Sequence, residues 1–123
     1  QKIAMGEPES VPAGKYASET LTSLNLLDKV KSKLVYAQNV RQVLAYVESG
    51  DAEAGLVYQT DANISDKVKV AAVADASLHS SLVYPVAVVK DSKNQEEAKA
   101  FVDFLSSEKA TAVFEKYGFT MVK

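Results

Sequence analysis

The sequence predicts an α/β fold with a mixed, mostly parallel sheet flanked by helices, followed by two C-terminal helices. Short apolar segments alternate with amphipathic helical segments up to Tyr58, and this alternation is typical of parallel strands joined by crossover helices. The chain has 123 residues, of which 47% are hydrophobic, and this is enough for the core of one domain.

The first strand, helix and second strand are predicted within residues 3–36. A short apolar strand at 3–5 ends at the turn sequence "GEP". A helix entered through Pro12 follows, and a second strand covers 34–36. Side chains three and four positions apart predict one face of that helix: Tyr16, Thr20, Leu21, Leu24 and Leu27.

The second helix has the clearest boundaries in the sequence. Asn39 is placed to cap it, and Gln42, three positions later, is placed to reach back as in a capping box. Gly50 follows its last turn as a C′ glycine does. Apolar residues recur along it at helical spacing: Val40, Val43, Leu44 and Val47.

The remaining residues are predicted to hold three extended segments and two helices. Residues 55–58 form a third strand, alternation at 68–72 predicts a half-buried strand, and the apolar run 82–89 is interrupted by Pro85. Asn94 with Glu97 caps one helix, Ser107 begins the next, and Gly118 ends it. Their apolar faces carry Ala98, Phe101, Val102 and Leu105, then Ala110, Val113, Phe114 and Tyr117.

Composition excludes several classes of function. The 14 Lys and Arg are dispersed among 16 Asp and Glu, so a nucleic-acid partner is not expected. There is no cysteine and His79 is the only histidine, which excludes thiolate and two-histidine metal sites. We interpret His79 as a loop residue without a ligand role. Acidic residues in the predicted loops are interpreted as solvated and not as an acid–base pair: Asp51, Glu53, Asp61 and Asp66.

Catalytic and membrane motifs are also absent from the sequence. It contains no nucleophile–base set, phosphate loop or dinucleotide motif, so an enzyme is not predicted. The longest apolar run is far shorter than the roughly 20 residues of a membrane helix. We expect any export signal to lie outside these residues, and the start "QKIAMG" suggests a piece of a longer protein.

Two predicted helix starts have the character of an anion site. The first N–H groups of a helix are unpaired and carry partial positive charge, so two starts that converge on one point bind an anion without a charged side chain. In "SVPAGK", Pro12 has no N–H, which leaves Ala13, Gly14 and Lys15 as donors. Gly14 also leaves room for a bound group. In "AQNVRQ", Val40 is the first helical residue.

Ordinary helix capping is the alternative interpretation of both starts. Each start follows directly on a strand, and anion sites in open α/β sheets lie at the carboxyl ends of strands. Tyr58, which ends "GLVY", is either a hydroxyl donor or a packing residue whose tip lies in water. Arg41 is interpreted as half of a surface salt bridge and not as an anion ligand.

Three stretches of the sequence resemble a known family. They are "IAMGEPESVPAGKYA", "AQNVRQVLAYVESGDAEAGLVYQTDA" and "VYPVAVVKDSKN…EAKAFVDFLSS…VFEKYGF". Together they are similar to the C-terminal half of the molybdate-binding protein of bacterial and archaeal ABC importers. The likeness covers essentially the whole chain, with Glu7 standing where Asp or Asn is more usual before Pro8.

The resemblance implies a lobe of the periplasmic-binding-protein fold (type II) and a tetrahedral oxyanion, molybdate or tungstate, held by neutral hydrogen bonds. No cofactor and no direct protein–metal ligand is implied. The donors carried over are the backbone N–H groups of Ala13 and Val40 and the hydroxyl of Tyr58. Supporting positions are Pro12, Gly14 and Asn39.

The resemblance also implies an organisation and partners. Residues 1–84 would form the second ligand-binding lobe, and 85–123 a crossover strand and helices that pack on an N-terminal lobe outside this chain. The expected partners are the oxyanion, the ABC permease and that lobe, or a second copy of the chain in a homodimer or a swapped dimer. The expected location is periplasmic, or extracellular and tethered as a lipoprotein. Alternatives are a lobe for sulfate, phosphate or a small organic anion, and a ligand-free interaction or regulatory domain.

Overall fold

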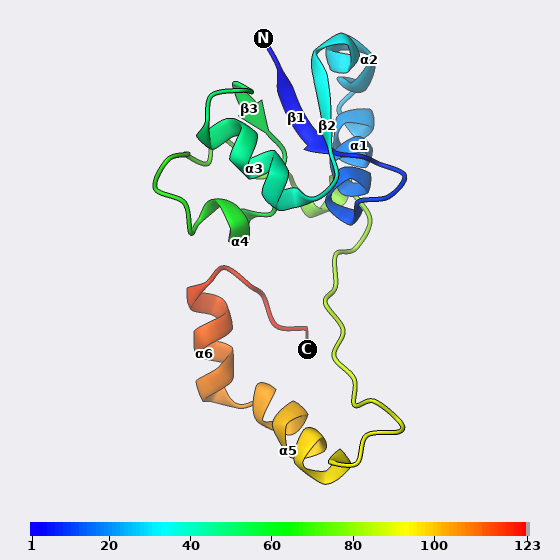
Figure 1. Cartoon of the computed structure of the whole chain (residues 1–123), viewed down its shortest axis with the longest axis vertical. Helices are drawn as coiled ribbons and strands as arrows, with labels where there is room; N and C mark the ends of the chain where they lie inside the picture. Colours follow the sequence, from blue (N-terminus) through cyan, green and yellow to red (C-terminus); the bar gives the residue numbers. More distant parts are fainter. Residues whose placement is uncertain (123) are drawn as a thin grey trace. The chain divides into compact units, whose positions relative to one another are not determined.

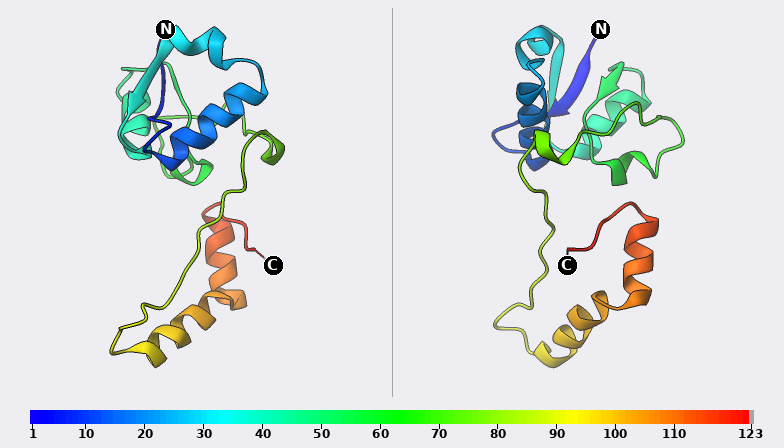
Figure 2. Two further views of the ribbon diagram at one scale, coloured as in Figure 1. Left: turned by 90° about the vertical axis from the view of Figure 1, so that its right-hand side faces the viewer. Right: turned by 180° about the vertical axis from the view of Figure 1, so that it is seen from behind.

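The structure is a computed structural model that describes residues 1–122. The chain divides into two compact units, one comprising Gln1–Ser81 and the other beginning at Leu82. Figures 1 and 2 show the elements of both units, which are described separately below.

A three-stranded parallel sheet forms the centre of the first unit. Its strands are β1 (Ile3–Gly6), β2 (Leu34–Ala37) and β3 (Ala54–Gly55), in the order β2-β1-β3. The register pairs Ile3 with Leu34 on one side and with Ala54 on the other. Because both pairings are parallel, all three strands end at the same edge of the sheet, and the loops that follow them leave from that edge.

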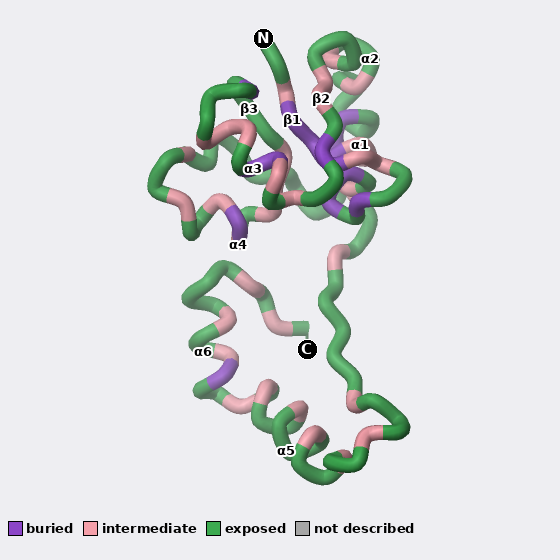
Figure 3. The backbone as a smooth tube through the Cα atoms, viewed as in Figure 1, coloured by how far each residue is buried: buried purple, intermediate pink, exposed green. Residues whose placement is uncertain are grey.

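The two main helices of this unit pack against β1 through separate hydrophobic clusters. Helix α1 covers Pro12–Ser23 and α3 covers Val40–Glu48. Ala4 is buried in the cluster that contains Val43 of α3, whereas its neighbour Met5 is buried in the cluster that contains Leu21 of α1. Successive strand side chains point to opposite faces, so β1 is covered on both sides. Buried residues accordingly gather on β1 and on parts of α1 and α3 (Figure 3).

Short elements complete the first unit. They are α2 (Leu27–Val30), the 3₁₀ turn η1 (Lys31–Lys33), α4 (Gln59–Ala62) and the 3₁₀ turn η2 (Ala76–Leu78). Helix α1 ends earlier than its apolar spacing predicts, because Asn25 adopts a left-handed conformation with φ 55°. Leu24 is consequently the exposed C-cap of α1, and Leu27 belongs to α2.

Three of the predicted strands differ in the structure. The third is only Ala54–Gly55, and Tyr58 is instead the N-cap of α4. Neither 68–72 nor 82–89 belongs to a strand. Apolar alternation identifies a segment able to enter a sheet, but a strand also needs a neighbour for its backbone hydrogen bonds, and no such ladder forms here within residues 1–122.

The second unit contains α5 (Gln95–Leu105) and α6 (Glu108–Lys116), which contact one another. The Oγ of Ser107 accepts from the N–H of Ala110 at 3.3 Å, and Gly118 follows α6 with φ 92°, so both predicted boundaries of α6 are confirmed. Asn94 is the N-cap residue of α5, but its side chain accepts no capping hydrogen bond. The predicted capping pair is therefore wrong at that helix.

The apolar faces predicted for α5 and α6 are only partly buried. Phe101, Val113 and Tyr117 each leave more than half of their surface accessible, and Ala110 is the buried residue of α6. The Phe119 ring packs edge-on against Phe114 and Tyr84, with ring centroids 6.0 and 5.8 Å apart. Helix pairs of this size bury little by themselves, so this unit has only a small core.

Candidate functional site

The segments that follow the three parallel strands carry all of the candidate donor positions. After β1 the chain enters α1, after β2 it enters α3, and after β3 it enters α4. The N–H of Glu7 donates to the carbonyl of Ala37 at 2.9 Å, and the N–H of Leu56 to the carbonyl of Ala4 at 3.0 Å. These bonds extend the pairing beyond the strands. The first turns of the helices are thereby fixed at one edge of the sheet.

The start of α1 leaves backbone donors without a partner in the chain. Pro12 is the first helical residue, and its N-cap, Val11, offers no side-chain acceptor. The first helical hydrogen bond runs from the N–H of Lys15 to the carbonyl of Val11 at 3.0 Å, so the prediction of Lys15 as a free donor is wrong. Among the described residues, the N–H groups of Ala13 and Gly14 donate to no backbone or side-chain acceptor, and both residues are buried.

Gly14 is required by packing between α1 and the end of β1. A Cβ on Gly14 would lie 2.2 Å from the carbonyl oxygen of Gly6 and 2.4 Å from its carbonyl carbon. Both are backbone atoms, which cannot rotate away. The glycine therefore allows the helix to approach the strand, which is a different reason from the predicted room for a bound group.

The start of α3 is capped as predicted. The Oδ1 of Asn39 accepts from the N–H of Gln42 at 2.9 Å. The side chain of Gln42 reaches back and accepts from the N–H of Gln38 at 2.9 Å, one residue before the position expected of a capping box. The N–H of Val40, the first helical residue, has no acceptor within residues 1–122. The cap thus fixes the turn and leaves the first donor pointing outward from the helix end.

Tyr58 lies at the third loop, directly before α4. Its carbonyl accepts from the N–H groups of Asp61 and Ala62 at 3.0 and 3.2 Å, which fixes the Tyr58 backbone to α4. The tyrosine side chain is half-buried. The structure thus brings the candidate residues Ala13, Val40 and Tyr58 to the same edge of the sheet.

An ion pair joins the loops that follow β2 and β3. The Nε of Arg41, in the first turn of α3, lies 3.0 Å from the Oδ1 of Asp61 in α4. The predicted salt bridge of Arg41 is confirmed. The interpretation of Asp61 as a solvated loop residue is wrong, because only 11% of its side chain is exposed. The pair neutralises both charges, so the donors of this edge are left as neutral dipoles.

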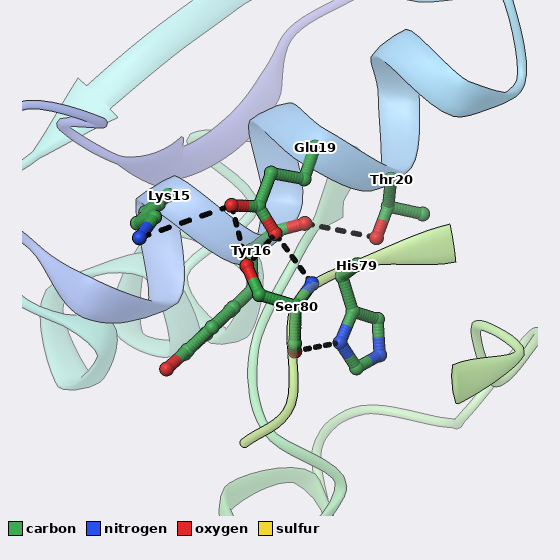
Figure 4. A network of polar contacts seen from close by, with 6 residues as sticks. All are labelled: Lys15, Tyr16, Glu19, Thr20, His79 and Ser80. Carbon is green, nitrogen blue, oxygen red and sulfur yellow. Dashed lines mark hydrogen bonds and ion pairs between the residues drawn. The ribbon is translucent and has the colours of Figure 1, made fainter. Parts of the chain in front are cut away.

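A second polar network holds the segment after η2 against α1 (Figure 4). The carboxylate of Glu19 accepts from the N–H of Ser80 at 2.7 Å and from the Ser80 hydroxyl at 2.6 Å. These hydrogen bonds lower the pKa of Glu19 below its ordinary value of 4.5, and the charge of Lys15, whose Nζ lies 4.0 Å from the carboxylate, acts in the same direction. This contact could not be predicted from the sequence, since Glu19 and Ser80 are 61 positions apart.

His79 is part of the same network. Its ring packs edge-on against Tyr16 with ring centroids 5.9 Å apart, and its Nδ1 lies 2.9 Å from the carbonyl oxygen of Ser80. The residue is half-buried beside α1. Among residues 1–122 no cluster of three or more His, Asp or Glu side chains is arranged to hold a metal ion.

Comparison with known proteins decides the family. The family of bacterial extracellular solute-binding proteins matches residues 1–120 of the chain. The chain belongs to this family. Its members are binding proteins, and the neutral donors at the sheet edge are consistent with that class.

Several solute-binding proteins are similar to this one along nearly its whole length. The putative ABC transporter substrate-binding lipoprotein YvgL of Bacillus subtilis is 58% identical over 120 residues, which are 98% of this chain and 46% of that protein. The molybdate-binding protein ModA of Haemophilus influenzae is 46% identical over 118 residues, which are 96% of this chain and 46% of that protein. The chain thus spans about half the length of the curated relatives it matches.

Solved structures confirm the predicted fold. The substrate-binding domain of a putative molybdenum ABC transporter from Clostridium difficile superposes with a TM-score of 0.85 and 53% identity, over 99% of this chain and 53% of that one. The periplasmic molybdate-binding protein of Azotobacter vinelandii superposes with a TM-score of 0.80 at 24% identity, and this match bears on the fold alone. The resemblance to molybdate-binding proteins is therefore confirmed. Among the described residues, no helix is both long and apolar enough to cross a membrane.

Proposed function

We propose that this solute-binding chain supplies one side of a cleft for a tetrahedral oxyanion, molybdate or tungstate, which the protein delivers to an ABC permease. The observation that carries the proposal is the convergence of two helix starts with unpaired N–H groups on one edge of a parallel sheet. The name of the Haemophilus influenzae relative supports molybdate as the ligand.

The proposed donors are the N–H groups of Ala13 and Val40 and the hydroxyl of Tyr58. Each would replace part of the hydration shell of a dianion. Backbone dipoles already fixed by α1 and α3 do not have to reorient when the ligand binds, and they act more strongly in a site from which water is excluded. Pro12 supports the site by fixing the first turn of α1, and Asn39 supports it by capping α3.

Gly14 supports the site indirectly in this proposal. Its packing against Gly6 fixes how far α1 extends past the end of β1, and Ala13 is the adjacent residue. Selectivity for molybdate or tungstate over sulfate would come from the size of the cleft and the positions of all its donors. No metal–protein bond and no cofactor is needed, because the anion is bound through its oxygen atoms.

The rest of the cleft is assigned to a second lobe outside this chain. The relatives are about twice as long, which supports a division of the donors between two lobes. We place the boundary of the lobe at residues 84–85, with 85–123 as the crossover and the helices that pack on the other lobe. The partly exposed apolar faces of α5 and α6 support such packing, and a dimer would cover the same faces. The family and the lipoprotein relative support an extracytoplasmic location, periplasmic or lipid-anchored.

Titration calorimetry on the longest natural form of the protein that contains this chain tests the proposal. Molybdate and tungstate should bind, and sulfate should bind much more weakly. Tyr58→Phe should weaken molybdate binding, because a hydrogen bond to a charged group contributes about 1.5–3 kcal/mol. Sulfate binding as tight as molybdate would contradict the choice of ligand. The isolated chain should bind poorly, and micromolar affinity in it would contradict the division of the donors.

A further inference from the structure

We propose that Arg41 and Asp61 are positioning residues that fix the relative positions of two of the proposed ligand donors, Val40 and Tyr58. This inference rests on the proposed function. Neither Arg41 nor Asp61 is itself proposed to contact the oxyanion. Their role is to fix the distance between α3 and the short helix α4.

The path between the two donors is short and has few bonds. Val40 and Arg41 are consecutive in the first turn of α3. The Nε of Arg41 lies 3.0 Å from the Oδ1 of Asp61, and the N–H of Asp61 donates to the carbonyl of Tyr58 at 3.0 Å. One ion pair and one backbone hydrogen bond therefore link Val40 to Tyr58 through Arg41 and Asp61.

Helix α4 needs such a connection, because it is too short to be rigid by itself. It has four residues, and the strand before it has only two. Isolated helices of this length are unstable in water, so the position of α4 depends on what it contacts. A second tether lies further from the donors, where the hydroxyl of Ser65 donates to the carboxylate of Glu48.

Burial supports the assignment to Asp61 in particular. Its side chain is 11% exposed, whereas that of Arg41 is 64% exposed. A carboxylate with so little access to water needs a charged or hydrogen-bonding partner, and Arg41 is its cation. Arg41 is thus assigned to the charge of Asp61 and not to the oxyanion.

The alternative role is electrostatic, and the two roles predict opposite effects of Asp61→Asn on oxyanion binding. If charge alone mattered, Arg41→Met would weaken oxyanion binding, and Asp61→Asn would strengthen it by removing a negative charge. If the pair positions the donors, both variants misplace α4, so both weaken binding. The double variant should then cost about as much as either single one, because the two residues act as one unit.

The experiment measures molybdate affinity by calorimetry in the longest natural form of the protein, for the two single variants and the double variant. Displacing one donor to a charged ligand should weaken binding about tenfold in each. Arg41→Lys should retain part of the affinity. Ser65→Ala, which removes the distant tether, is the control and should bind as wild type does. Circular dichroism verifies that each variant is folded.

A ligand-free measurement keeps the inference separate from the proposed function. Amide hydrogen exchange at Asp61 and Ala62, whose N–H groups bond to Tyr58, should accelerate in Arg41→Met and Asp61→Asn and stay unchanged in Ser65→Ala. Wild-type protein that binds no oxyanion would contradict the proposed function, while unchanged exchange at these amides would contradict the positioning role. If Asp61→Asn binds molybdate more tightly and Arg41→Met binds it more weakly, the positioning role is contradicted and the charges act on the anion directly.

Discussion

Replacing Gly14 with alanine should destabilise the first unit, although alanine is the better helix former. The added Cβ would lie 2.2 Å from the carbonyl oxygen of Gly6 and 2.9 Å from the carbonyl carbon of Glu7. Ordinary contact begins at 3.4 Å, so α1 and the end of β1 would have to separate by more than 1 Å. Backbone atoms on both sides make this a shift of whole elements and not of a side chain.

Two opposing contributions set the change in the free energy of unfolding for Gly14→Ala. Helix propensity favours alanine over glycine by about 1 kcal/mol. Overpacking a well-packed site costs about 1–3 kcal/mol and occasionally more, and rigid backbone contacts lie at the upper end of that range. The free energy of unfolding should therefore fall by about 2 kcal/mol, with α1 displaced from the Met5–Leu21 cluster.

Urea unfolding followed by circular dichroism, with amide exchange at Met5 as a reporter of the first unit, measures this change. Gly50→Ala is the matched control, because a Cβ there meets nothing within 4 Å and only the left-handed φ of 80° opposes it. That strain costs about 1–2 kcal/mol without moving any element. A Gly14→Ala variant that is more stable than wild type, as helix propensity alone predicts, or unchanged amide exchange at Met5 would contradict this prediction.

Two further predictions concern the helix cap and the Glu19 network. Asn39→Ala removes the acceptor for the N–H of Gln42 and should lower the free energy of unfolding by about 1 kcal/mol, which an unchanged urea midpoint would contradict. Because the pKa of Glu19 is lowered on folding, its contacts stabilise the fold above pH 4.5 and are lost as the pH falls through the lowered value. The Ser80 amide resonance should therefore titrate below pH 4.5 in wild type and lose that titration in Glu19→Gln; a midpoint at or above 4.5 would contradict the lowered pKa.

The elements that local chemistry determines were predictable from the sequence. Helix α3 is capped by the side chain of Asn39 and is followed by a glycine at φ 80°, and both signals lie within a few residues of the helix ends. Ser107 and Gly118 bound α6 in the same way. Such boundaries depend on hydrogen bonds between near neighbours, which the residue types specify.

The features that depend on distant contacts were not predictable. Segments 68–72 and 82–89 have strand-like alternation, but pairing depends on a partner strand that alternation does not identify. At the site, the helix starts at Ala13 and Val40 could be located from capping residues and strand order. The role of Gly14 could not be predicted, since Gly14 packs against the backbone of Gly6, which belongs to another element. The same holds for the burial of Asp61, which depends on how α4 packs on α3.

Val40→Pro removes the backbone N–H at the start of α3 that we propose binds the oxyanion. Proline is tolerated at the first helical position, and the extended Asn39, with ψ 164°, suits the residue before it. The substitution removes the N–H and no helical hydrogen bond. Val40→Ala is the control, because it shortens the side chain and keeps the N–H.

Molybdate affinity of the two variants, measured by calorimetry in the longest natural form of the protein, gives the answer. We predict that Val40→Pro binds about 10- to 150-fold more weakly than Val40→Ala, which corresponds to one hydrogen bond to a charged ligand. Equal affinity of two folded variants would contradict the claim.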